Sequence, residues 1–210
     1  MDKILRYFVL ITLLPLAFSS SVFALNPSPA KGEKLPIINL PIPKNSVEKI
    51  YLGLQGDGFF KIQQIKAEAV IIKVFNLYCP ICQSSANAMV ELYYQIENHP
   101  EFKEKIKLIG IGAGNSSLEV EVFKQNHNIP FPLFPDEDFK IHKILGEVRT
   151  PFFIATKMAG DGSHEIVYTH LGGLTDARAF LDLMVEAYGI KQEDLLIKEA
   201  ASPPMESSPK

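Results

Sequence analysis

Apolar residues along the middle of the chain form two kinds of pattern, continuous runs and helical repeats. Runs without polar alternation are typical of strands buried on both faces of a sheet. Three such runs predict strands at 70–75, 106–111 and 152–156. Apolar residues that recur every three or four positions predict amphipathic helices at 80–97, 118–126 and 175–188. Strands and helices therefore alternate through most of the chain.

Weaker patterns fill the gaps between these elements. They predict strands at 51–54, 131–134 and 165–169, a short element at 59–65 and a helix at 136–145. The glycine-rich turn 160–163 joins the strands on either side of it into a hairpin. The order is strand, helix, strand, helix, then the hairpin and a last helix. It predicts an α/β protein whose mixed sheet is covered by helices on both faces.

The two ends of the chain differ in composition from its middle. Five prolines between 25 and 47 predict an extended lead-in rather than a helix. Residues 191–210 hold too few apolar side chains to pack, and they predict a largely disordered tail. The folded domain is therefore expected over 48–190, a length that suits one domain.

The first 24 residues have the organisation of a secretory signal peptide. Lys3 and Arg6 precede an apolar core over 8–18, and a stretch of small residues ends at Ala24, where cleavage is expected. The alternative is an uncleaved membrane anchor, but this core of 11 residues is interrupted by a proline. It is also shorter than the roughly 20 residues that span a bilayer. The prediction is export to an extracytoplasmic compartment, the periplasm in bacteria, without stable membrane insertion after cleavage.

The charge of the chain excludes one class of partner. The sequence has 21 basic and 24 acidic residues, for a net charge of −3. Loss of residues 1–24 removes two basic residues and one acidic residue, which changes the net charge to −4. A weakly acidic protein lacks the electrostatic footprint for nucleic acid or an anionic membrane, so neither is expected as a partner.

The only two cysteines of the chain stand in Tyr78-Cys79-Pro80-Ile81-Cys82, shortly after the first apolar run. This spacing at a strand-to-helix junction points to thiol-disulfide chemistry. Cys79 lies at the helix start, where unpaired backbone N–H groups and the helix dipole favour a thiolate, and Cys82 lies one turn inside. The alternative, a structural bridge, is weak because so small a ring removes little entropy from the unfolded chain.

Lys73 is the one ionisable residue inside the apolar run 70–75. Burial of an ammonium group is costly unless the group is paired or deprotonated. Lys73 would therefore either favour a nearby thiolate or titrate low enough to act as a base. The alternative is that its long stem reaches the edge of the sheet and keeps the charge in water.

No cofactor or metal site is expected from the sequence. The five histidines share no ligand spacing, and most of them stand beside proline, glycine or charged residues, which is typical of solvated positions. The glycine-rich run 110–114 departs from the dinucleotide-binding fingerprint, and it predicts a turn at a strand end.

The strand, the Cys-x-x-Cys pair, the following helix and a later Thr150-Pro151 before another strand resemble the thioredoxin superfamily. Pro151 follows Cys79 by 72 positions. This separation is similar to that of the extracytoplasmic TlpA/ResA-like and peroxiredoxin-like branch, whose extra helix and strand would lie here at about 112–134. The resemblance covers about 35–188 and implies a thioredoxin-like fold.

The resemblance also implies roles for single residues. Cys79 would be the attacking thiolate and Cys82 the resolving thiol. Pro151 would be a cis-proline beside the sulfurs, and the backbone of Thr150 would pair with an extended substrate segment. From the residues alone, a trans Pro151 that begins a strand is also compatible. Tyr78 replaces the usual tryptophan and would supply a flat apolar wall with a polar tip.

Two departures from the family pattern concern the proton of Cys82. The buried acid of thioredoxin, six positions before the first cysteine, corresponds to Lys73 in this sequence. The glutamate of ResA-like proteins, three positions after the second cysteine, corresponds to Ser85. The usual proton acceptor is therefore missing from both places.

The expected function is exported thiol-disulfide exchange with protein substrates through Cys79 and Cys82. The protein would act as a reductant that a membrane or envelope redox partner recharges. One alternative is a peroxidase of the peroxiredoxin type, disfavoured because Asn76 stands where those enzymes have threonine or serine. The other is a copper chaperone resembling the SCO proteins, disfavoured because three residues separate the cysteines of those proteins.

Overall fold

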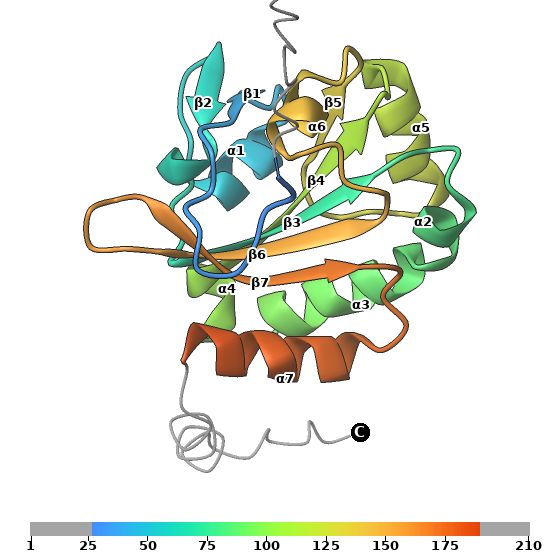
Figure 1. Ribbon diagram of the computed structural model, residues 1–210. Coiled ribbons are helices and arrows are strands. Elements are labelled where there is room, and N and C mark those ends of the chain that lie inside the picture. Colours follow the sequence, from blue (N-terminus) through green and yellow to red (C-terminus); the bar gives the residue numbers. More distant parts are fainter. Residues whose placement is uncertain (1–26, 190–210) are drawn as a thin grey trace, which may run out of the picture.

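The computed structural model describes residues 27–189, and a five-stranded mixed sheet forms its centre (Figure 1). The strands stand in the order β5-β4-β3-β6-β7. Their bounds are Ala69–Phe75 (β3), Ile106–Ala113 (β4), Leu133–Asp136 (β5), Phe152–Met158 (β6) and His164–Leu171 (β7). The predicted α/β class and mixed sheet are confirmed. The predicted signal peptide 1–24 and tail 191–210 lie outside the described residues.

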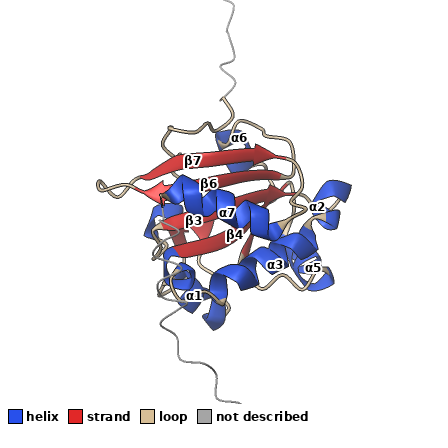
Figure 2. Ribbon diagram, turned by 90° about the horizontal axis from the view of Figure 1, so that it is seen from below, coloured by secondary structure: helices blue, strands red, loops and turns tan. Residues whose placement is uncertain are grey.

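Helices cover both faces of this sheet, as Figures 1 and 2 show. One face carries α3 (Ala86–Glu97), α4 (Phe102–Lys105), α5 (Ser117–Asn126) and α7 (Ala177–Tyr188). The other carries α1 (Ser46–Leu52), α6 (Lys140–Ile144) and a small sheet of β1 (Asn39–Pro41) and β2 (Phe59–Lys61). The short α2 (Pro80–Ser84) follows β3, and a 3-10 turn (Ile62–Gln64) follows β2. Each layer buries its own apolar cluster against the sheet.

β3 is the central strand of the sheet, and all seven of its residues are buried. It pairs in parallel with β4 and antiparallel with β6. This register places Lys73 opposite Gly110 on one side and opposite Phe153 on the other. Because strands flank β3 on both sides, a side chain in its middle lies far from either sheet edge.

The proline-rich segment before α1 packs against the sheet. Its Leu35 N–H donates a hydrogen bond to the His164 carbonyl at 2.7 Å, so the segment runs along the outer edge of β7. Leu35, Ile38 and Leu40 are buried and belong to the same apolar cluster as α1 and α6. A covered edge strand is protected from pairing with another chain.

The prediction of a strand over 51–54 is wrong, because residues 51 and 52 belong to helix α1. Asn45 caps this helix by accepting a hydrogen bond from the Val47 N–H at 2.8 Å. Gly53 ends it with φ 67°, a left-handed conformation that glycine adopts without a steric penalty. Leu52 is the buried residue of the helix. A helix of seven residues offers too few turns for its period to be distinguished from that of a strand.

Two helices also differ in detail from the prediction. The helix expected over 80–97 is divided at Ser85 into α2 and α3. The helix expected over 175–188 begins at Ala177, and the carboxylate of its N-cap, Asp176, accepts the Ala179 N–H at 2.9 Å. By contrast, the predicted hairpin between β6 and β7 is confirmed.

Candidate active site

The candidate active site lies at the carboxyl end of β3, where residues 76–78 lead into α2 (Figure 1). Cys79 is the N-cap of α2, and Pro80 occupies the first helical position, where its fixed φ and missing N–H are favourable. The Cys79 Sγ atom accepts a hydrogen bond from the Cys82 N–H at 3.4 Å. As a thiol, Cys79 also donates to the Thr150 carbonyl at 3.5 Å. This sulfur therefore lies between a helix start and the loop before β6.

The two cysteines are free thiols in different environments. Cys79 is partly exposed, whereas Cys82 is fully buried. Partial burial opposes the ionisation of Cys79, but hydrogen bonds from the side chain and N–H of Cys82 and from the Thr150 side chain outweigh it and lower the pKa of Cys79. Burial, with the hydrogen bond to Cys79, raises the pKa of Cys82 to about 12. Cys79 is thus the more acidic thiol, and Cys82 is the one held in its protonated form.

Thr150 contacts this sulfur across 71 positions of sequence, and Pro151 follows it directly. The peptide bond between them is cis, the isomer that the resemblance implied. The Pro151 carbonyl accepts a hydrogen bond from the Gly172 N–H at 2.9 Å, which ties the loop before β6 to the end of β7. The structure therefore brings Cys79, Thr150 and Pro151 together, although they come from separate parts of the chain.

Lys73 is buried in the sheet beside the cysteine pair, with 3% of its surface exposed. Its Nζ atom lies 3.4 Å from Ser85 Oγ and 6.0 Å from the ring centroids of both Phe123 and Phe153. The alternative in which the stem carries the charge to the sheet edge is therefore wrong. Burial lowers the pKa of Lys73 to about 8, although a charge on Cys82 would raise it.

Ser85, which corresponds in sequence to the glutamate of ResA-like proteins, is also buried. Its hydroxyl donates to the Cys82 carbonyl at 3.3 Å, which leaves an oxygen lone pair to accept the hydrogen bond from Lys73. Because the partner of the lysine is a neutral hydroxyl, no negative charge at Ser85 holds Lys73 in its ammonium form. An amine rather than a carboxylate is thus the ionisable group that acts on Cys82 from within the sheet.

Tyr78 stands next to Cys79 with 69% of its surface exposed. Its hydroxyl donates a hydrogen bond to the carboxylate of Glu119, at the first turn of α5. This bond raises the pKa of Tyr78 and lowers that of Glu119, because it stabilises the phenol and the carboxylate together. The exposed ring is thus anchored at its polar tip.

The profile of the AhpC/TSA family matches residues 33–166, more than half of the 210 residues. The chain belongs to the AhpC/TSA family. The matched region contains both cysteines, Lys73, Thr150 and Pro151. Among curated protein sequences, none matches this family member significantly.

Solved structures that are similar to this AhpC/TSA family member share its thioredoxin-like fold. A candidate thiol:disulfide interchange protein DsbE from Chlorobium tepidum has a TM-score of 0.57 and 15% identity, with 77% of this chain and 99% of that chain covered. The thioredoxin domain of a thiol-disulfide oxidoreductase from Bacteroides vulgatus has a TM-score of 0.55 and 12% identity, with 75% and 99% covered. The predicted membership of the thioredoxin superfamily is confirmed. Within residues 27–189, no helix is long and apolar enough to cross a bilayer.

Three side-chain amides hold the 76–78 loop of this family member, a role that was not predicted from the sequence. Asn76 accepts from the Tyr78 N–H at 2.8 Å and donates to the backbone at the end of β4. Asn115 accepts from the Leu77 N–H at 2.8 Å, and Gln83 donates to the Leu77 carbonyl at 2.7 Å. A signal was available, because Asn76 and Asn115 each follow an apolar run, where the backbone leaves the ladder and needs new partners.

Substitution Gly112→Ala is expected to disturb this support. The new Cβ would lie 2.9 Å from Val120 Cγ2 and 3.1 Å from Asn115 Cβ, and both neighbours are buried. Overpacking of this kind costs about 1–3 kcal/mol of the free energy of unfolding. Urea denaturation measures it, with Gly160→Ala as the control, because no atom lies within 4 Å of a Cβ at Gly160. Equal stability of the two variants would contradict this account of the packing.

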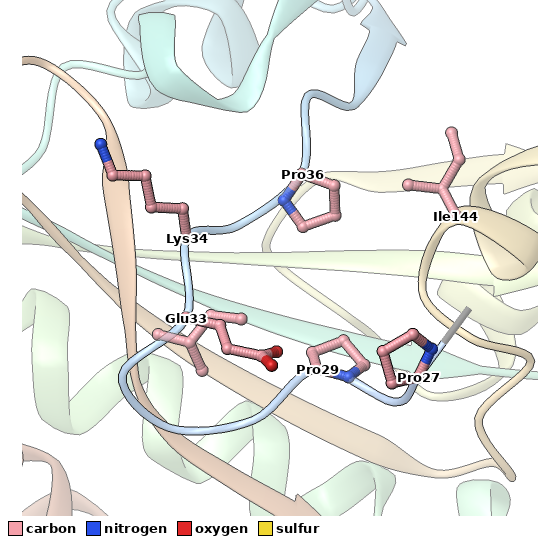
Figure 3. A pocket seen from close by; sticks show the side chains of 7 residues that line it. Pro27, Pro29, Glu33, Lys34, Pro36 and Ile144 are labelled. Atoms are coloured by element: carbon pink, nitrogen blue, oxygen red, sulfur yellow. The ribbon is translucent and has the colours of Figure 1, made fainter.

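A cavity of about 280 Å³ lies between the lead-in, α6 and β7 (Figure 3). Three proline rings, of Pro27, Pro29 and Pro36, line it together with Ile144 and Ile166, and Glu33 and Lys34 also border it. None of the predicted site residues borders this cavity. It is therefore separate from the candidate active site.

One histidine departs from the solvated position expected for most of the five. His164 is fully buried in β7, and its Nδ1 atom lies 2.9 Å from Thr156 Oγ1. Burial lowers the pKa of His164, which keeps the ring neutral at neutral pH. Over the described part of the chain, 27–189, no three histidine, cysteine, aspartate or glutamate side chains gather as metal ligands would.

Proposed function

We propose that this protein is an exported thiol-disulfide oxidoreductase that exchanges the Cys79–Cys82 dithiol or disulfide with protein partners, in the direction of a reductant. The observation that carries the proposal is the contrast between the two thiols. The accessible one, Cys79, has a lowered pKa, and the buried one, Cys82, has a raised pKa. Because the thiolate is the attacking species in exchange, the accessible sulfur is also the reactive one. The AhpC/TSA membership and the names of the structural neighbours support the same chemistry.

In the proposed reaction, the Cys79 thiolate attacks one sulfur of a substrate disulfide. A disulfide forms between Cys79 and the substrate, the substrate S–S bond breaks, and its second sulfur leaves as a thiolate that takes up a proton. Cys82 then loses its proton and attacks Cys79 Sγ, which releases the substrate as a dithiol and leaves a Cys79–Cys82 disulfide. Two electrons pass to the substrate, so a membrane or envelope redox partner must reduce the protein again.

Thr150, Pro151 and Tyr78 form the proposed docking edge for the substrate. When Cys79 is a thiolate, it no longer donates to the Thr150 carbonyl, which frees this acceptor for a backbone N–H of an extended substrate segment. Pro151 has no N–H of its own to compete. The exposed ring of Tyr78, adjacent to Cys79, offers a flat apolar surface to the same segment.

Lys73 is the proposed proton acceptor of Cys82. The two positions at which related proteins have a carboxylate hold Lys73 and Ser85 here, and their side chains lie within 3.4 Å of each other. A lysine with a pKa of about 8 has a neutral fraction near neutral pH, and this neutral amine can take the proton that Cys82 must lose before it attacks.

Export is proposed from residues 1–24, whose charged start, short apolar core and small-residue end suit a cleaved signal peptide. The proposed location is extracytoplasmic, and the bacterial periplasm is the setting that suits this signal and this fold. Disulfides persist in such compartments, so substrates for a reductant of this kind are present there.

The family also supports a second candidate, reduction of a peroxide by Cys79. In the peroxiredoxin-type enzymes that the sequence resembles, a threonine or serine stands three positions before the attacking cysteine. Here Asn76 holds that position, and both ends of its amide are already engaged by backbone groups. Exchange with protein disulfides is therefore the better-supported function.

One pair of rate measurements separates these candidates. The reduced protein without residues 1–24 is mixed with insulin as a disulfide-bonded protein, and in parallel with hydrogen peroxide, and the second-order rate constants are compared. We expect the disulfide to react faster, and we expect a reduction potential near that of thioredoxin, about −270 mV, rather than near about −120 mV. A much faster reaction with peroxide would favour the peroxidase. A potential near the upper value would reverse the proposed direction.

A further inference from the structure

Glu119, at the first turn of α5, joins this helix to the residue before Cys79. One carboxylate oxygen, Oε2, accepts the Ser116 N–H at 2.8 Å and the Ser116 hydroxyl at 3.0 Å, which completes the capping box of α5. The other oxygen, Oε1, accepts the hydroxyl of Tyr78 across 41 positions of sequence. Helix capping therefore uses one oxygen and leaves the second for Tyr78.

We propose that Glu119 is a positioning residue for thiol-disulfide exchange. By holding the Tyr78 hydroxyl, it fixes the chain directly before Cys79 and the orientation of the ring that faces the substrate. The inference rests on the proposed function, because it names a residue that serves the same site.

The exposure of Tyr78 is the first reason why this bond matters. With 69% of its surface exposed, the ring has little packing to hold it in one orientation, so the hydrogen bond at its tip does so. The bond also persists over a wide pH range. The hydrogen bond forms between the ionised carboxylate of Glu119 and the neutral phenol of Tyr78. Because the pKa of Glu119 is lowered and that of Tyr78 is raised, both groups keep these forms over a wider pH range.

The position of α5 is the second reason. The turn before this helix already holds the loop through Asn115, which accepts the Leu77 N–H at 2.8 Å. Glu119 binds the next residue, Tyr78. Leu77 and Tyr78, the two residues before Cys79, are therefore both hydrogen-bonded to α5 or to the turn before it. A fixed loop keeps Cys79 Sγ where the Cys82 N–H reaches it at 3.4 Å, and this contact helps to lower the pKa of Cys79.

The test compares Tyr78→Phe, Glu119→Ala and the double variant with wild type, all in the chain without residues 1–24. The readouts are the pKa of Cys79, from the ultraviolet absorbance of its thiolate, and kcat/KM with insulin and with glutathione disulfide. Each single variant is expected to raise the pKa of Cys79 and to lower kcat/KM for insulin by about tenfold. The loss with glutathione disulfide is expected to be smaller, since this small substrate does not need the Tyr78 ring.

Two features make the test decisive. The double variant is expected to lose no more than either single variant, because both changes break the same bond. Ser116→Ala is the matched control, since it removes the cap of α5 and leaves the Tyr78 contact, and it is expected to keep the wild-type pKa of Cys79. The proposal is overturned if Tyr78→Phe and Glu119→Ala leave that pKa and the insulin kinetics unchanged, or if Ser116→Ala reproduces Glu119→Ala. If wild-type protein fails to reduce insulin, the proposed function is refuted. The Cys79 pKa values of wild type and variants would still test whether Glu119 positions the loop before Cys79.

Discussion

Substitution Cys82→Ser is expected to trap the protein on its substrates, whereas Cys79→Ser is expected to abolish exchange. Cys79 is the accessible thiol with the lowered pKa, so its loss removes the proposed nucleophile and should lower the rate by several orders of magnitude. Without Cys82, the first attack still occurs, but no thiol remains to break the disulfide between Cys79 and the substrate. Non-reducing electrophoresis after reaction with insulin, followed by mass spectrometry of the adduct, measures both outcomes.

The double variant Cys79→Ser/Cys82→Ser is the control for this pair, because it has no thiol. Adducts formed by Cys79→Ser but absent from Cys82→Ser would reverse the assigned roles. Equal trapping by both single variants would mean that burial does not protect Cys82 from attack, contrary to its complete burial in the structure.

The elements that carry the cysteines were predictable because their signals are local. An apolar run interrupted only by Lys73 marks β3, and Pro80 directly after Cys79 marks a helix start. The misread α1 shows the limit of such signals. This helix ends at one glycine, at φ 67°. It is also too short for the helical period of its apolar residues to be recognised in the sequence. For Pro151 and Lys73, the local sequence pattern is compatible with two arrangements each, and only the folded structure decides between them.

The burial of Lys73 could not be deduced from its own strand. A lysine in an apolar run reaches water if the strand lies at an edge, and it cannot if neighbouring strands flank both sides. Only the pairing of β3 with β4 and β6 decides between these cases. The loop supports at Asn115 and Glu119 were missed for a related reason. Each lies about 40 positions from its partner, so the contact exists only in the folded chain.

Substitution Lys73→Met is expected to slow the resolving step. Methionine keeps a long apolar stem but removes the amine, so Cys82 loses both its proposed proton acceptor and the charge that lowers its pKa. Release of the substrate should slow by about 10²-fold, and the adduct with Cys79 should accumulate transiently. Quenched-flow analysis of the adduct measures this rate. In wild type, the rate should rise with pH as the neutral fraction of Lys73 grows and level off above its pKa of about 8.

Lys73→Arg separates the two ways in which this residue acts on Cys82. Arginine stays charged, so it can stabilise a thiolate but cannot accept a proton. If Lys73 is the proton acceptor, Lys73→Arg should be nearly as slow as Lys73→Met. A rate equal to that of wild type would show that charge alone suffices and would remove the proposed base.

Stability gives an independent test of the buried lysine. A pKa lowered from 10.5 to about 8 means that the unfolded chain binds more protons between these two pH values, so wild-type stability rises with pH across this window. Below pH 8 the folded protein carries the full cost of the buried ammonium, on the order of 3 kcal/mol. In a background where both cysteines are alanine, Lys73→Met should therefore be more stable than its parent at pH 7. This advantage should shrink as the pH approaches 10.

The other groups around Lys73 do not produce this pattern. Cys79 and Cys82 are absent from that background, and Ser85, Phe123 and Phe153 do not titrate in the window. Burial, together with the charge of Lys73, lowers the pKa of His127. This histidine is therefore already neutral below pH 8, where the window begins. Urea denaturation at several pH values measures the difference. A Lys73→Met variant that is less stable than its parent at pH 7 would mean that the ammonium is well solvated or paired. Lys73 would then not have the lowered pKa on which its proposed role as a base depends.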